Sequence, residues 1–190
     1  KAANAAKNLL VAVAEGERDL EASRAALCRS YNFVPTEAFS RINRDNSKGI
    51  DIVEVINFIK DNNVTDIADA EVAHVVDYYD TLEKDRNQVL TSDEWNSIVL
   101  LCEDNTLRTE VLARTGKEWK DIGRLPANVE DQITDILIKE VQLIRKVEAL
   151  KNVLLSAEGF NLEVLFKSID GNGNGEFTMD ELSEFLKKNG

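Results

Sequence analysis

Oxygen-bearing side chains alternate with small residues near the end of the chain. Residues 170–181 read DGNGNGEFTMDE. Ca²⁺ is a hard cation that prefers six to eight oxygen ligands, and a twelve-residue loop of the form D-x-[DN]-x-[DN]-G-x₅-E can supply them. The spacing therefore predicts a Ca²⁺-binding loop at 170–181.

Each ligand position in this segment has a physical reason. Side-chain oxygens at the first, third and fifth positions converge as the backbone winds, and Gly175 permits the sharp turn with positive φ. Glu181 is long enough to reach back and bind with both carboxylate oxygens. The expected ligands are Asp170, Asn172, Asn174, the backbone carbonyl of Glu176, Thr178 directly or through water, and Glu181. The alternative is a metal-free Gly- and Asn-rich turn between two helices.

Apolar residues at helical spacing flank this segment on both sides. They are Leu162, Leu165, Phe166 and Ile169 before it, and Leu182, Phe185 and Leu186 after it. In this helix–loop–helix setting the segment resembles the EF-hand superfamily, the calmodulin-like calcium-binding proteins. The resemblance implies Ca²⁺ binding by the six residues named above and a short β contact from Phe177 to a paired loop.

Residues 43–54, NRDNSKGIDIVE, are a degenerate copy of the same template. Its possible ligands are Asn43, Asp45, Ser47, Asp51 and Glu54. Asn43 replaces the leading Asp and loses a charge. Lys48 replaces the turn glycine, which would force it toward positive φ at a cost of roughly 1 kcal/mol. Either this loop binds Ca²⁺ or it keeps the fold without metal.

Residues 83–94, EKDRNQVLTSDE, are a second degenerate copy. Its possible ligands are Glu83, Asp85, Asn87, Thr91 and Glu94. Glu83 is one methylene longer than the usual Asp, Gln88 replaces the turn glycine, and Lys84 and Arg86 bring positive charge into the loop. We expect both degenerate loops to favour a metal-free structural role.

The chain repeats itself without a gap at an offset of 127 residues, so that Glu54 and Phe58 recur as Glu181 and Phe185. One unit is a long leading helix and an EF-hand pair (1–103). A connecting segment (104–127) contains short helices around Leu107–Leu112 and Trp119–Ile122. The second unit (128–190) is a long helix and one hand. We therefore expect an all-α fold and a piece of a longer array.

Two features of this repeat leave alternatives open. Leu20 and Leu27 mark one face of the first long helix, and Ile144 and Leu154 mark one face of the second. Such helices either lie in the core of their own unit or bind a partner helix. The 170–181 hand would pair with another molecule, with downstream residues or with the segment 104–127.

The formal net charge of the chain is −12. Nucleic acids and anionic membrane surfaces are bound through basic residues, so neither is expected as a partner. No apolar run approaches the roughly 20 residues that span a bilayer. We expect a protein partner, either a helical target or a neighbour in an assembly.

Cys28 and Cys102 lie far apart, and His74 is the only histidine. A zinc site needs about four such ligands, so zinc is not expected, and reduced thiols suit an intracellular protein, cytoplasmic or cytoskeletal. His74 has no nucleophile motif nearby, and P-loop, GxGxxG and GxSxG patterns are absent from the sequence. We therefore expect no enzymatic activity and take His74 as a partly buried helix residue.

Two classes of function fit these patterns. The first is calcium binding with one good site, and the single methionine, Met179, argues against a calmodulin-like sensor with a Met-rich groove. The second is a calcium-independent scaffold in a larger cytoskeletal or ciliary assembly, an analogy that rests on the repeated organisation.

Overall fold

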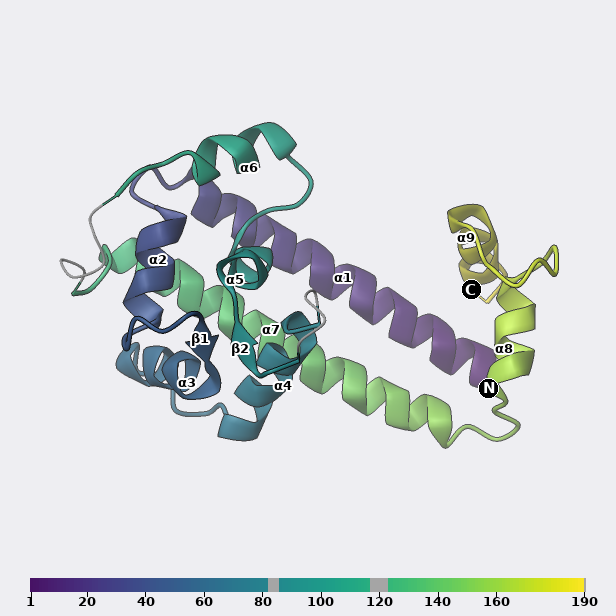
Figure 1. Ribbon diagram of the computed structural model, residues 1–190. Coiled ribbons are helices and arrows are strands. Elements are labelled where there is room, and N and C mark those ends of the chain that lie inside the picture. The colour runs from purple at the N-terminus through teal and green to yellow at the C-terminus, as the bar shows by residue number, and fades with distance from the viewer. Residues whose placement is uncertain (82–85, 117–122, 190) are drawn as a thin grey trace. The chain divides into compact units, whose positions relative to one another are not determined.

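The computed structural model describes residues 1–81, 86–116 and 123–189. Within these residues the fold is helical apart from one two-stranded sheet, in agreement with the predicted all-α character (Figure 1). The elements are α1 (Ala2–Arg29), α2 (Pro35–Ile42), β1 (Ile50–Asp51), α3 (Ile52–Asp61), α4 (Asp69–Tyr79), β2 (Val89–Leu90), α5 (Ser92–Val99), α6 (Asn105–Leu112), α7 (Ala127–Leu155), α8 (Leu162–Ile169) and α9 (Met179–Lys188).

The chain forms two compact units. Unit 1 contains Lys1–Gly16 and Arg145–Gly190, and unit 2 contains Glu17–Ile144. Both long helices contribute to both units. Unit 1 therefore combines the start of the first repeat with the second repeat from Arg145 on.

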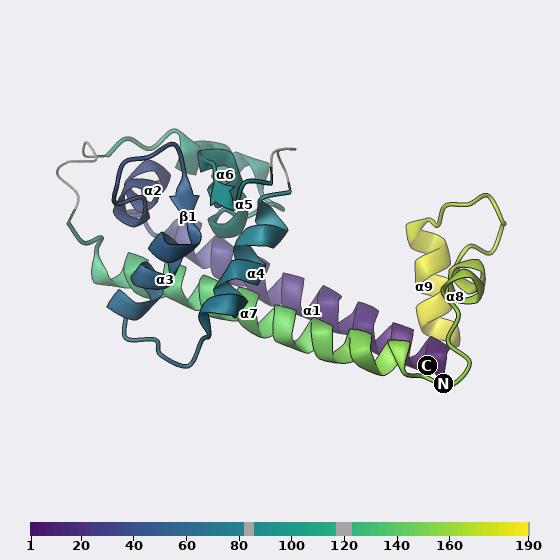
Figure 2. The same cartoon turned by 60° about the horizontal axis from the view of Figure 1, so that its bottom comes forward.

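Unit 2 is built around two helix–loop–helix motifs, α2–β1–α3 and α4–β2–α5. Their loops lie side by side (Figure 1 and Figure 2). They form an antiparallel strand pair, with Ile50 opposite Leu90 and Asp51 opposite Val89. Helix α3 also contacts α4, and α2 contacts α5. Each motif thus covers the apolar face of the other.

Gly49 has a steric role beside this sheet. A Cβ at residue 49 would lie 2.6 Å from both the backbone oxygen of Leu90 and Cγ1 of Val89. We expect Gly49→Ala to destabilise unit 2 by about 1–3 kcal/mol, since the strands must separate to admit the methyl group. Urea unfolding measures the change. Gly123→Ala is the matched control, because its Cβ would meet nothing within 4 Å, and an equal effect of both changes would contradict the steric account.

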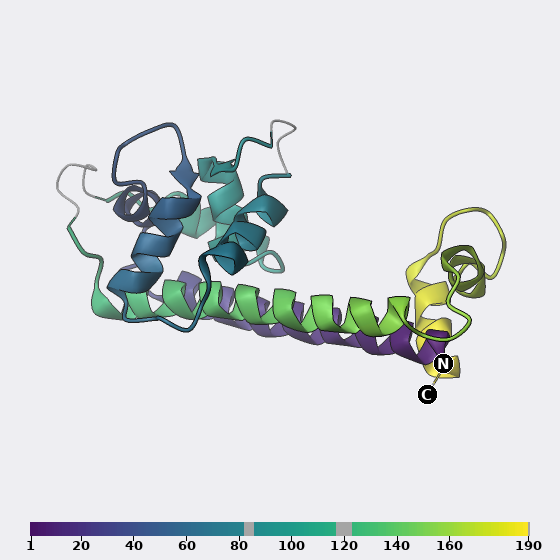
Figure 3. The ribbon, with the colours of Figure 1, turned by 90° about the horizontal axis from the view of Figure 1, so that it is seen from below.

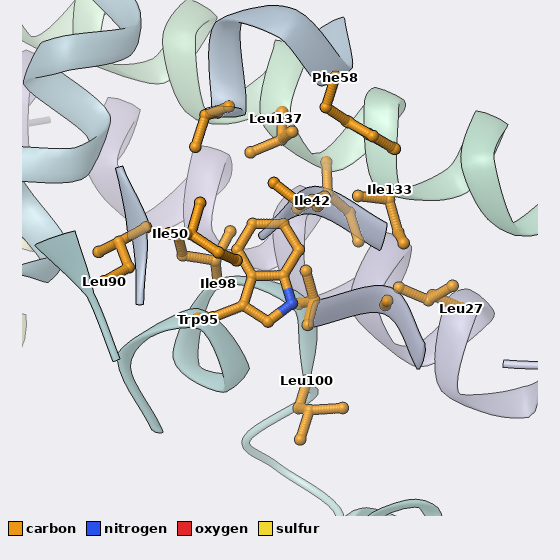
Figure 4. Close-up of a cluster of buried hydrophobic side chains, with 14 of the residues drawn as sticks. Leu27, Ile42, Ile50, Phe58, Leu90, Trp95, Ile98, Leu100, Ile133 and Leu137 are labelled. Carbon is orange, nitrogen blue, oxygen red and sulfur yellow. The ribbon is translucent and has the colours of Figure 1, made fainter. Parts of the chain in front are cut away.

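Trp95 lies at the centre of the unit 2 core and is fully buried. Figure 4 shows its ring among Ile42, Ile50 and Ile98, which come from both motifs. Leu27 of α1 and Ile133 of α7 belong to the same cluster. The core of unit 2 therefore joins both motifs to the long helices.

The unit 2 portions of α1 and α7 lie side by side and antiparallel (Figure 3). Ser30 donates to Gln132 at 2.8 Å, and Lys139 donates to Ser23 at 2.7 Å. In this unit α1 lies against the motifs of its own repeat, as the core alternative predicts, whereas α7 lies against those same motifs rather than against its own.

A buried polar network links four elements of unit 2. The Arg24 guanidinium donates from Nε to the Ile98 carbonyl at 2.8 Å, and from one terminal nitrogen to the Tyr79 hydroxyl at 2.9 Å and to Glu140 Oε1 at 2.8 Å. The Tyr79 hydroxyl donates to the same Glu140 oxygen at 2.6 Å. Burial raises the pKa of Glu140, although these hydrogen bonds oppose the shift. The Arg24–Glu140 ion pair thereby links α1 to α7, and its hydrogen bonds to Tyr79 and Ile98 extend the network to α4 and α5.

Unit 1 contains one helix–loop–helix motif, α8–α9, together with the ends of both long helices. Its buried core consists of Ala5, Ala6, Leu154, Ile169 and Phe185. The side chains of Glu15 and Lys146 also pair at 3.8 Å. This is a much smaller apolar core than that of unit 2.

Two predictions about single elements have outcomes here. Helix α6 matches the helix predicted at Leu107–Leu112, whereas Trp119–Ile122 lies outside the described residues. His74 lies on α4 as predicted, but it is exposed rather than partly buried. The reason is that α4 places Val72, Val75 and Val76 in the core. His74, which lies between Val72 and Val75 in the sequence, therefore faces outward. None of the helices in the described part of the chain is long and apolar enough to cross a membrane.

Candidate metal centre

The 170–181 loop joins two helix ends that fix its geometry. Asp170 caps the C-terminus of α8, and Thr178 caps the N-terminus of α9. Gly173 and Gly175 have φ values of 71° and 86°, a region that favours glycine. The left-handed turn predicted at Gly175 is confirmed, and a second one precedes it at Gly173.

The side chains at the odd positions of the loop accept hydrogen bonds from its own backbone. Asp170 Oδ1 accepts the N–H of Gly173 at 2.9 Å, and Oδ2 accepts that of Gly175 at 2.9 Å. The amide oxygens of Asn172 and Asn174 each accept the N–H two residues further on, at 3.0 and 2.9 Å. These bonds turn the three side chains toward the inside of the loop.

Glu181 closes the loop from its other end. Its Oε1 accepts the N–H of Asn172 at 3.1 Å, and its Oε2 accepts the N–H of Thr178 at 2.9 Å. The hydrogen bond from the Thr178 backbone is the main cause that lowers the pKa of Glu181 below its usual value. This carboxylate therefore stays ionised to lower pH than an ordinary Glu side chain.

Glu181 also has a purely structural role. The Thr178 hydroxyl accepts the Glu181 N–H at 3.3 Å while the Glu181 carboxylate accepts the Thr178 N–H, which is a capping box at the start of α9. The same arrangement occurs at Asp51–Glu54 and at Thr91–Glu94. A Glu at the last loop position is thus explained by helix capping alone, and metal binding needs further support.

The donor set of the 170–181 loop fits a hard cation. Its inward side chains offer two carboxylates and two amide oxygens. Asp170 Oδ2 accepts one backbone N–H and keeps a second lone pair, whereas Asp170 Oδ1 accepts two backbone N–H groups and Glu181 Oε2 accepts both the N–H and the hydroxyl of Thr178. Asp170 is buried, whereas the other loop residues are exposed or half-buried. Among the described residues no group of three or more His, Cys, Asp or Glu side chains could hold a metal ion. Any cation here would therefore depend on amide and backbone oxygens as well.

The 43–54 loop reaches a similar shape by a different turn. Asn46 takes positive φ, at 55°, and Lys48 does not. The prediction of a strained Lys48 is therefore wrong, because the chain turns two residues earlier at an Asn, a residue type that tolerates this region. Glu54 nevertheless closes the loop as Glu181 does, with its Oε1 accepting the N–H of Arg44 at 2.7 Å.

Asn43 bridges the interior of this loop with two hydrogen bonds. Its amide nitrogen donates to the Ser47 carbonyl at 3.0 Å, while its amide oxygen accepts the Ser47 N–H at 3.1 Å. A carboxylate such as Asp170 has no N–H to donate, so it cannot make the first of these bonds. Asp45 is exposed and accepts the Ser47 N–H at 2.8 Å, and Asp51 caps α3. The 43–54 loop is held by its own hydrogen bonds.

In the third loop the structure points to a residue that sequence reasoning missed. Asp80 caps the C-terminus of α4 and is buried, and its Oδ2 accepts the Gln88 N–H at 2.6 Å. Gln88 has φ 62°, so this bond matches the one from Gly175 to Asp170. Asp80 therefore stands where the template placed Glu83. The signal in the sequence is that Asp80 directly follows the apolar run of α4. It lies three residues before Glu83, where a twelve-residue loop ending at Glu94 would begin.

The remaining predicted ligands of this loop are partly described. Glu83 and Asp85 lie outside the described residues. Asn87 accepts the Val89 N–H at 2.8 Å, and Glu94 is fully buried and caps α5 with Thr91. The other Asp80 oxygen is buried and has no hydrogen-bond partner in the described part of the chain.

Comparison of the chain with protein-family models, with curated proteins and with solved structures finds no match. The function is therefore inferred from the three loops. Of the three, only 170–181 joins a leading Asp, two inward Asn side chains, two positive-φ glycines and a closing Glu without a Lys or Arg between them.

Proposed function

We propose that this chain binds Ca²⁺ through the 170–181 loop, and that its helix–loop–helix motifs belong to the EF-hand superfamily. The proposal rests mainly on Asp170, a buried carboxylate at the end of α8 whose two oxygens point into a loop lined with further oxygen donors. A bound Ca²⁺ would supply the positive charge that this acidic loop lacks. Asp170, Asn172, Asn174, Thr178, Glu181 and the Glu176 carbonyl would hold it.

The pairing of β1 with β2 supports the EF-hand part of the proposal. It joins Ile50 and Leu90, which occupy the eighth position of their loops in the template. The template predicts a β contact at this position, and Phe177 holds it in the 170–181 loop.

Calorimetric titration of chelator-stripped protein with Ca²⁺ tests the proposal. We expect one site, and we expect Glu181→Gln to abolish it. Gln also supports a capping box, so this change keeps the start of α9 and removes only the ligand charge. Glu54→Gln is the matched control at the equivalent repeat position, and it should leave the titration unchanged.

The other outcomes are equally informative. A second or third site that is lost in Glu54→Gln would mean that the 43–54 loop also binds Ca²⁺. One that is lost in Asp80→Asn would mean the same for the loop that follows α4. Absence of Ca²⁺ binding in the unmodified protein would contradict the proposal.

A calcium-independent scaffold is the second candidate function. The observation in its favour is that the 43–54 loop closes through Asn43 and its capping box, while Arg24 and Glu140 form a buried ion pair in the core of unit 2. On this proposal, helicity measured by circular dichroism would be the same in excess chelator as in Ca²⁺. A large gain of helix on adding Ca²⁺ would count against the scaffold.

A further inference from the structure

Two asparagines of the 170–181 loop directly precede glycines. Asn172 is followed by Gly173, and Asn174 is followed by Gly175. The backbone nitrogen of the next residue can attack the amide carbon of an asparagine side chain, and a glycine, which has no Cβ, lets that nitrogen approach most closely. The Asn–Gly pair is therefore the dipeptide most prone to losing its side-chain ammonia. Neither degenerate loop contains this pair.

The hydrogen bonds around Asn174 bring together the groups that this reaction needs. The amide oxygen of Asn174 accepts the Glu176 N–H at 2.9 Å, which folds the side chain over the peptide bond to Gly175. This donor stands where negative charge would develop on the oxygen during the attack. The attacking atom, the Gly175 nitrogen, donates its hydrogen bond to Asp170 Oδ2 at 2.9 Å. A general base lies at this distance from the proton donor it serves.

The Asp170 carboxylate serves Asn174 better than it serves Asn172. Its Oδ2 accepts one backbone N–H, that of Gly175, whereas its Oδ1 is shared between the N–H groups of Gly173 and Asn174. Asp170 is also buried, which limits the solvation of its carboxylate by water. Asn174 is exposed, so water can reach the product of the attack.

We propose that the folded loop converts Asn174 to an acidic residue without an enzyme. The Gly175 nitrogen forms a bond to the side-chain amide carbon of Asn174. Its proton passes by way of Asp170 to the amide nitrogen, which leaves as ammonia and closes a succinimide ring. Water then opens the ring at either carbonyl and gives an aspartate or an isoaspartate at position 174. The net reaction consumes water and releases ammonia, and no atom is oxidised or reduced.

Asn189 supplies an internal comparison, because it also precedes a glycine, Gly190. Its amide nitrogen, the leaving group of the reaction, donates to the Phe185 carbonyl at 2.8 Å. This bond holds the leaving group and directs the side chain back toward the last turn of α9. We therefore expect Asn189 to react more slowly than Asn174, although the next residue is the same.

The conversion would change the charge of the candidate metal centre. Asn174 occupies the fifth position of the loop, and an aspartate there would raise the inward carboxylates from two, Asp170 and Glu181, to three. An isoaspartate would instead lengthen the backbone by one methylene and displace the oxygen at this position. The reaction itself needs only the hydrogen bonds described above and no cation, so it is independent of the proposed Ca²⁺ binding.

Incubation of the whole chain in chelator at neutral pH, followed by peptide mass spectrometry, tests the proposal. In the folded protein we expect Asn174 to convert at least about tenfold faster than Asn189. In concentrated guanidinium chloride the two should convert at similar rates, because unfolding removes the hydrogen bonds and leaves the same dipeptide at both sites. A folded protein in which Asn174 converts no faster than Asn189, or an excess that persists after unfolding, would overturn the proposal.

Asp170→Ser tests the part assigned to the carboxylate. Ser keeps a short oxygen acceptor but is not a base at neutral pH, and unlike Asn it creates no further Asn–Gly pair with Gly171. Conversion of Asn174 should slow about tenfold or more in the folded variant and stay unchanged in guanidinium chloride. Asp180→Ser, in the first turn of α9, removes the same charge and is the matched control that should keep the original rate. An unchanged rate in folded Asp170→Ser would contradict the role of Asp170, and if this variant fails to fold, the comparison of Asn174 with Asn189 still decides.

Discussion

Trp95→Ala should cost unit 2 about 3–5 kcal/mol of unfolding free energy, the usual loss for a buried Trp or Phe truncated to Ala. Trp95 is fully buried and contacts side chains from both motifs of unit 2. Its removal would leave a cavity that rigid helices cannot close. Urea unfolding followed by circular dichroism measures the loss, and Tyr31→Ala, at a 90 % exposed aromatic residue, is the control.

Trp95→Phe separates the effect of side-chain volume on stability from the effect of the buried indole N–H. The indole N–H is buried without a hydrogen-bond partner in the described part of the chain. Phe removes this unsatisfied donor and keeps most of the apolar ring, so we expect a much smaller loss than for Ala. A Trp95→Ala protein within about 1 kcal/mol of the unmodified chain would contradict the central position of this side chain.

Glu140→Leu is expected to destabilise unit 2 by about 3–5 kcal/mol, because it removes the nearest carboxylate of the buried Arg24 guanidinium and leaves it Glu17 and Glu21, each at 3.7 Å. The Arg24–Glu140 bond is 2.8 Å long, and both side chains are about 95 % buried. The exposed pair Lys139–Asp19 offers the contrast. Asp19→Leu should change the unfolding free energy by no more than about 1 kcal/mol.

The double variant Arg24→Met/Glu140→Leu tests whether the cost comes from a stranded charge. With both charges replaced by apolar side chains of similar size, the loss should be clearly smaller than the sum of the single losses. Unfolding free energies of the four proteins in this cycle give the coupling directly. Additive losses would mean that Arg24 and Glu140 act independently.

The sequence predicted what depends on local pattern. Helical spacing of apolar residues is a local signal, so α8, α9 and α6 were found near their true bounds. Gly175 was assigned positive φ from its position in the template, and the structure agrees. The offset of 127 residues also anticipated that Glu54 and Glu181 close their loops in the same way.

The predictions from the template failed where the length of a loop or the type of a residue differs from that template. Counting twelve residues back from Glu94 gives Glu83, which lies outside the described residues, and the template misses Asp80, whose carboxylate accepts the Gln88 N–H. Lys48 occupies the position of a turn glycine, yet Asn46 supplies the positive φ. Which face of α4 meets the core depends on its partners, so the exposure of His74 was not readable from spacing.

The capping boxes have a consequence for how such loops can change over evolutionary time. In each of the three loops, the last Glu caps the start of the following helix through hydrogen bonds within the loop itself. A duplicated motif can therefore drift at its other oxygen positions, lose cation affinity and still fold. The architecture of such a motif is therefore heritable apart from the oxygen positions that a cation would use, and a helix–loop–helix with a degenerate loop still serves as a building block of the fold.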